Sequence, residues 1–147
     1  MPKPAERGKI RLVKVFGFQG VLSMKSRQNL VRLKLFQVNE KRRQLAQLDL
    51  MVGEFERMAA ELELQIAAEE KKAGITDINH FAYPTFARAA RQRRDNLRNS
   101  QMDLQEQKKA AEAALVEAEE ELTKAEMLES RDARAHGEDG SGRQALA

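Results

Sequence analysis

Residues 45–66 read LAQLDLMVGEFERMAAELELQI, and apolar side chains recur in this stretch in alternating steps of three and four. This 3.5-residue period keeps one stripe of a helix facing a partner helix, as in a coiled coil. With Glu69 as its one polar member, the stripe consists of Leu45, Leu48, Val52, Phe55, Ala59, Leu62, Ile66 and Ala73. A single helix cannot bury such a stripe alone, so the sequence predicts a second helix packed against it.

A second stripe with the same period follows a break in the chain. Gly74 is a good helix terminator, and Pro84 suits the first turn of a new helix. With Arg94, Gln101 and Lys108 as polar members, the second stripe consists of Ala87, Ala90, Leu97, Leu104, Ala111, Leu115, Ala118, Leu122 and Ala125. The sequence therefore predicts an all-α fold, a long two-helix antiparallel coiled-coil hairpin with disordered termini. Its helices are expected over about 26–73 and 84–135, with a turn over about 74–83.

The charges favour the antiparallel arrangement, because basic and acidic blocks alternate along the chain. The net charge is +10 over residues 1–43, −4 over 44–73, +3 over 74–100 and −6 over 101–147. Folding the chain at the turn sets each basic block against an acidic one, whereas a parallel pair of chains would set like charges together. One register pairs Glu69 with Arg94, and a slip of one heptad remains open.

The composition excludes several classes of protein. Charged residues make up 33% of the 147 residues, aromatic residues make up 5%, and there is no cysteine. No stretch approaches the ~18 consecutive apolar residues of a membrane-spanning helix. The sequence contains no glycine-rich phosphate loop, nucleophile elbow, paired-histidine helix motif or calcium loop. We therefore expect a protein that is not an enzyme and has no metal, no cofactor and no transmembrane segment.

The stripe is less regular upstream of Leu45. Extended upstream, the same spacing places Val31 and Val38 in the stripe, but it also places the charged residues Lys34 and Lys41 there. Three large apolar residues lie outside the frame, namely Leu30, Leu33 and Phe36. Two interpretations remain open here: a stutter shifts the stripe, or this end of the hairpin is loosely packed.

The two ends of the chain differ from the rest. Residues 1–23 contain no heptads, and Lys14 interrupts their apolar stretch in a way that a signal peptide would not. We expect a disordered arm or an upstream mis-start there, with Met24 as the natural first residue. Residues 136–147 are rich in glycine and are expected to form a flexible tail.

Two groups of residues are candidates for binding a partner. The first surrounds the turn and comprises His80, Phe81, Tyr83 and Phe86. A thin hairpin offers aromatic side chains little core to enter, so they either staple the loop or form a docking patch. The second is the basic group of the first helix: Arg27, Arg32, Lys34, Arg42 and Arg43. Its positive charge exceeds what the acidic second helix is expected to neutralise, which favours an acidic partner.

Nucleic-acid binding is the alternative interpretation of the basic residues. The basic residues concerned are Lys41, Arg42 and Arg43 of the first helix and Arg88, Arg91, Arg93, Arg94 and Arg98 of the second. No aromatic residues are interleaved with them to stack on bases, and acidic blocks lie opposite in the expected hairpin. We therefore expect no nucleic-acid partner.

Residues 24–44, MKSRQNLVRLKLFQVNEKRRQ, resemble the opening of the alphaproteobacterial flagellar export protein FliJ. Residues 79–87, NHFAYPTFA, and residues 93–97, RRDNL, strengthen this resemblance, which covers roughly residues 24–135. The loop segment is fairly specific, whereas the heptads resemble those of any coiled coil. Members of this family are antiparallel helical hairpins, similar to the central stalk subunit of rotary F-type ATPases.

The resemblance implies a component of the flagellar type III export apparatus. Such a protein would associate with the export ATPase FliI, its regulator FliH and the gate protein FlhA, and would escort export chaperones. It would be a monomeric, cytoplasmic hairpin, held peripherally at the inner face of the membrane at the flagellar base. The family motif does not assign these contacts to residues. From charge and exposure, we expect the basic group to face the ATPase ring and the aromatic group to face a second partner such as the gate. The competing hypothesis is a structural or nucleic-acid-associated coiled coil without an export role.

Overall fold

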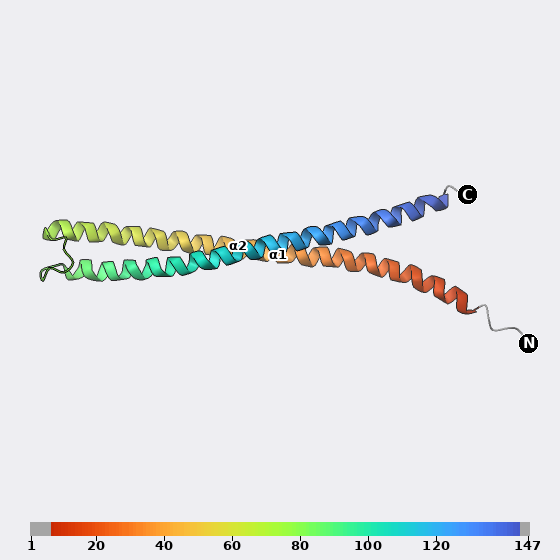
Figure 1. The fold of residues 1–147 in the computed structure, drawn as a ribbon, viewed down its shortest axis with the longest axis horizontal. Helices are drawn as coiled ribbons and strands as arrows, with labels where there is room; N and C mark the ends of the chain where they lie inside the picture. Colours follow the sequence, from red (N-terminus) through yellow and green to blue (C-terminus); the bar gives the residue numbers. More distant parts are fainter. Residues whose placement is uncertain (1–6, 145–147) are drawn as a thin grey trace, which may run out of the picture. The chain divides into compact units, whose positions relative to one another are not determined.

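The structure is a computed structural model that describes the backbone of residues 7–144 and the side chains of residues 24–140. It contains two helices, α1 (Arg7–Ala73) and α2 (Thr85–Gln144), and no strand within the described range (Figure 1). The helices pack against each other on either side of a short turn. The predicted all-α, antiparallel two-helix fold is therefore confirmed.

The ends of the helices at the turn follow from local chemistry. Gly74 has a φ of +66°, a left-handed conformation that other residues adopt at a cost, and it ends α1 directly after Ala73. Lys71 and Lys72 lie in the last turn of α1, where positive charge favours the helix dipole. At the start of α2, the carbonyl of Pro84 accepts the backbone N–H of Arg88 at 3.0 Å.

Both helices run further than the predicted bounds. α1 begins at Arg7 instead of near residue 26, and α2 continues to Gln144 instead of ending near residue 135. No proline lies between Pro4 and Pro84, and the glycines near the ends weaken a helix by about 1 kcal/mol each without interrupting its hydrogen bonds. The rest of the predicted extension and tail, residues 1–6 and 145–147, lies outside the described residues.

The hairpin divides into two units, each an antiparallel pair of segments from α1 and α2. The turn unit comprises Lys41–Ala114, and the terminal unit comprises the chain up to Glu40 and from Leu115 onward. The two candidate groups of the sequence are distributed over both units, so each unit is described by itself.

In the turn unit, the buried side chains that the two helices contribute are those of the predicted stripes. They are Val52, Ala59 and Ile66 of α1 and Ala87, Ala90 and Leu104 of α2. The remaining stripe positions of this unit are half-buried, including the polar Glu69 and Arg94, whereas Ala73 at the helix end is exposed. The heptad frame therefore identifies the core of this unit almost residue by residue.

In the terminal unit, the same frame continues without a shift. Val38 is fully buried, and Val31 and Lys34 in the frame are half-buried. The off-frame residues Leu30, Leu33 and Phe36 are exposed. The stutter interpretation is therefore wrong. Lysine fits the stripe because its alkyl stem covers apolar surface while its ammonium group reaches a carboxylate.

Candidate partner-binding site

The loop that joins the helices is fixed by its own hydrogen bonds. Asp77 accepts the first two of these bonds. Its Oδ1 accepts the N–H of Asn79 at 2.9 Å, and its carbonyl accepts the N–H of His80 at 3.1 Å. The Nδ1 of His80 then accepts the N–H of Ala82 at 3.1 Å, and its carbonyl accepts the N–H of Tyr83 at 3.0 Å. Such consecutive turns satisfy backbone groups of the loop and restrict its conformational freedom.

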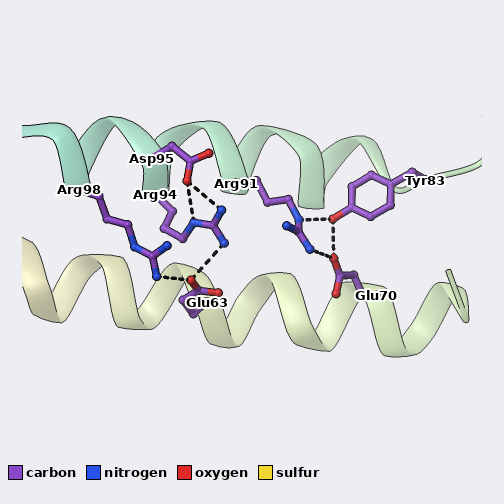
Figure 2. Close-up of polar contacts among 7 residues, drawn as sticks. All are labelled: Glu63, Glu70, Tyr83, Arg91, Arg94, Asp95 and Arg98. Atoms are coloured by element: carbon purple, nitrogen blue, oxygen red, sulfur yellow. Dashed lines mark hydrogen bonds and ion pairs between the residues drawn. The ribbon is translucent and has the colours of Figure 1, made fainter. Parts of the chain in front are cut away.

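Tyr83 joins this loop to both helices and is only 4% exposed. Its hydroxyl donates to Glu70 Oε1 of α1 at 2.7 Å and accepts from Arg91 Nε of α2 at 2.7 Å (Figure 2). The Nη2 of Arg91 also forms an ion pair with Glu70, which closes a triangle of three polar side chains. We refer to Glu70, Tyr83 and Arg91 as the clasp.

The clasp perturbs the titration of its members. Hydrogen bonds from Arg91, and then from Tyr83, lower the pKa of Glu70. Burial is the main reason why the pKa of Tyr83 is raised, and the hydrogen bond to Glu70 acts in the same direction. At neutral pH the clasp therefore consists of a carboxylate, a neutral phenol and a guanidinium.

The other aromatic residues around the turn are exposed. Phe81 is 95% exposed and Phe86 is 56% exposed. His80 is exposed as well and stacks on Phe81, with ring centroids 4.8 Å apart and 25° between the ring planes. Ile78 adds an exposed apolar side chain that the sequence reasoning had passed over. We refer to Ile78, His80, Phe81 and Phe86 as the turn patch.

The structure thus divides the four residues that the sequence had grouped. Tyr83 staples the loop, as the first interpretation expected, and does not lie on the exposed surface. Phe81 and Phe86 are exposed, which the docking interpretation requires, although exposure does not by itself establish docking. The sequence alone could not separate them, because the difference depends on which ring meets the carboxylate of Glu70.

The five basic candidates of α1 differ in how far their side chains are exposed. In the terminal unit, Arg27 Nε lies 2.6 Å from Asp132 Oδ2, and Lys34 Nζ lies 3.6 Å from Glu121 Oε2. These two cations therefore serve the contact between α1 and α2. The remaining three have exposed side chains: Arg32 in the terminal unit, and Arg42 and Arg43 in the turn unit.

The arginines of α2 are also largely engaged. Arg94 Nη1 and Arg98 Nη2 donate to Glu63 Oε1 at 3.1 and 2.6 Å (Figure 2). The expected pair between Glu69 and Arg94 is therefore not formed, and Glu69 pairs with Lys72 at 3.1 Å instead. These arginines are directed at carboxylates, which leaves them poorly suited to bind phosphate groups.

The described residues hold no group of three or more His, Cys, Asp or Glu that could bind a metal ion. In that same part of the chain, neither helix has a window apolar enough to cross a membrane. Comparison of the chain with protein-family models, with curated proteins and with solved structures finds no match in any of the three.

Proposed function

We propose that the chain is a non-enzymatic component of the bacterial flagellar type III export apparatus. In this proposal it binds the export ATPase FliI with its regulator FliH, binds the gate protein FlhA, and escorts export chaperones. Two features support the proposal: the resemblance of residues 24–135 to the FliJ family, and an antiparallel hairpin fold of the kind that this family has.

The observation that carries the proposal is the turn patch. Phe81 is almost fully exposed, although the loop that presents it is fixed by hydrogen bonds and by the clasp. When a partner buries this ring in a pocket, little entropy is lost in ordering the loop, because its hydrogen bonds already hold it in place. Exposed aromatic side chains of this kind are typical anchors of protein interfaces.

The basic residues contribute a second, electrostatic element to the proposal. Arg32, Arg42 and Arg43 are exposed on α1 and would steer the hairpin toward an acidic wall of the ATPase ring. Such steering weakens as salt screens the charges beyond about 8–10 Å at physiological ionic strength. We leave Arg27 and Lys34 out of this role, because their side chains are half-buried in the contact with α2.

The proposal is tested by deleting the gene in its motile source bacterium and measuring secretion of hook and filament proteins. We expect secretion to fail, and both the full chain and a chain that begins at Met24 to restore it. The variant Phe81→Ser should not restore it, because the loss of one exposed ring removes the anchor without changing the helices. Leu64→Ser is the matched control, since Leu64 is an exposed apolar residue away from the turn patch.

Circular dichroism separates folding from function here, because both serine variants should retain the helix content of the parent. Normal secretion in the deletion strain would refute the export proposal and favour a structural coiled coil. Secretion restored equally by Phe81→Ser and Leu64→Ser would refute the role of the turn patch alone.

A further inference from the structure

The two flanks of the turn unit differ. Side chains that follow a stripe position by one residue lie on one flank of the helix pair, and those that precede it lie on the other. The first flank carries the clasp and the pairs of Glu63 with Arg94 and Arg98 (Figure 2). Asp49, which pairs with Lys108 at 2.7 Å, also lies on this side. We refer to it as the ion-paired flank.

The opposite flank carries a groove between α1 and α2. The groove measures about 530 Å³, is open along one side, and lies wholly within the turn unit. Apolar side chains and short polar side chains share its lining, among them Met58, Leu62, Gln65, Asn96, Leu97 and Ser100. Half-buried Met58, Leu62 and Leu97 supply its apolar surface, while the amides and the hydroxyl are exposed beside them.

Arg93 on the α2 wall of the groove has no partner among the side chains that the structure describes. Unlike Arg91, Arg94 and Arg98, it makes no ion pair or hydrogen bond anywhere in the described part of the chain. The acid on the α1 wall, Glu61, forms no ion pair with Arg93 among the described residues. The groove therefore combines an apolar surface with the positive charge of Arg93, which forms no ion pair with a carboxylate of the described residues.

We propose that this groove binds an amphipathic α-helix of a partner protein, with leucine-sized residues on one face and a carboxylate that meets Arg93. A helix fits because the groove is an open trough between two helices, in which apolar anchors spaced three and four residues apart can pack. A carboxylate fits because it would give Arg93 the same kind of pair that the neighbouring arginines already have. The amide and hydroxyl groups beside the apolar surface supply the polar rim of such an interface.

This docking site is distinct from the turn patch and does not depend on the export proposal. A second copy of the chain is a less suitable occupant. The outer positions that could pair with the groove of another copy include exposed Leu50 and Leu64. Basic Arg57 lies two helical turns from each of them on the same face and would meet Arg93. Like charges in such an interface oppose association.

The test uses the full chain and a fluorescein-labelled peptide of about three heptads, with leucine at its a and d positions and glutamate at the flanking positions. We expect the peptide to bind, as measured by fluorescence anisotropy. Filling the groove by Ser100→Trp should weaken binding at least about tenfold. The matched control Met102→Trp adds the same ring two residues away on the exposed outer face and should leave binding unchanged.

Charge exchange tests the role of Arg93. Arg93→Glu should weaken binding of the glutamate peptide about tenfold and strengthen binding of an otherwise identical lysine peptide. Lys109→Glu is the control, because it makes the same change of net charge at an exposed position outside the groove. Circular dichroism of each variant confirms that the helices remain.

Three results would overturn the proposal. The first is no binding of the glutamate peptide to the parent chain at about 100 μM, a concentration that detects even weak docking. The second is equal binding to Ser100→Trp and Met102→Trp. The third is a dimer in sedimentation equilibrium that Ser100→Trp dissociates, because the occupant would then be a second copy. None of these results depends on the secretion assay, so the two proposals can fail separately.

Discussion

Two glycines of the turn unit show how the same residue type acts in opposite ways. Gly53 lies inside α1, and a Cβ atom added there would meet no heavy atom within 4 Å apart from its chain neighbours and the nearby backbone of its own helix. Gly74 is equally uncrowded, but its φ of +66° is one that a residue with a Cβ atom adopts at a cost. Backbone conformation, and not space, therefore separates the two positions.

We expect Gly53→Ala to raise the free energy of unfolding by about 0.5–1 kcal/mol, because alanine loses less backbone entropy in a helix. Gly74→Ala should lower it by about 1 kcal/mol, because the left-handed conformation is strained for alanine. Urea denaturation followed by circular dichroism measures both. A gain in stability for Gly74→Ala would contradict the requirement for glycine at this helix end.

Residue types alone did not determine which individual side chains are buried or which partners they have. The pattern predicted where aromatic residues gather, but the separation of buried Tyr83 from exposed Phe81 depends on a hydroxyl within reach of Glu70 and Arg91. Similarly, the expected partner of Arg94 was Glu69, whereas the structure pairs it with Glu63. Long side chains reach a full helical turn along the partner, so register alone does not choose among neighbouring carboxylates.

At the scale of the helix, the stripe was the strongest predictor. Heptad spacing identified both helices, their partnership and most buried positions, because burial of one face is what stabilises so long a helix. The bounds at the far ends were less predictable, since glycine weakens a helix without ending it.

The groove was not predicted, because the heptad pattern concerns the stripe positions and the groove is formed by positions beside them. The positions beside it carry the signal: acids such as Glu63 and Glu70 on one flank, Met58 and Gln65 on the other.

The clasp links α1, the loop and α2, and its acid gives the hairpin a defined response to pH. The pKa of Glu70 is lower in the folded chain, through hydrogen bonds from Arg91 and Tyr83, than in the unfolded chain. A group shifted in this direction stabilises the fold fully above its unfolded pKa, near about 4.3, and loses that contribution as the pH falls through its folded pKa.

We therefore expect Glu70→Gln to be less stable than the parent at pH 7, and this difference to shrink as the pH falls below about 4. Thermal unfolding of both chains at a series of pH values measures the difference. If the two stability curves ran parallel down to about pH 3, Glu70 would not be the group that responds.

At the scale of the whole chain, the polar contacts between the helices differ in how much chain they enclose. Tyr83 and Glu70 are 13 residues apart, Arg91 and Glu70 are 21 apart, and Arg98 and Glu63 are 35 apart. Closing the loop for the last of these costs about 0.9 kcal/mol more in chain entropy than closing the loop for the first. The clasp is therefore the contact between the helices that forms most readily from an unfolded chain.

The order in which these contacts form predicts which substitutions affect the rate of folding. Tyr83→Phe removes the hydroxyl that bridges Glu70 and Arg91, and should slow refolding in stopped-flow measurements by several-fold, on the order of 1 kcal/mol in the barrier. Arg27→Ala removes an ion pair with Asp132 in the terminal unit and should mainly accelerate unfolding. The reverse assignment of the two effects would place the folding nucleus in the terminal unit.

Formation of the contacts near the turn before the others also matters during biosynthesis. α1 is complete before any residue of α2 exists, so its apolar stripe leaves the ribosome without a partner. The clasp needs only the chain up to Arg91, and pairing can begin there while the rest of α2 is still being translated. Each further turn of α2 then covers the next part of the stripe, which shortens the time during which a translating chain exposes a surface prone to aggregation.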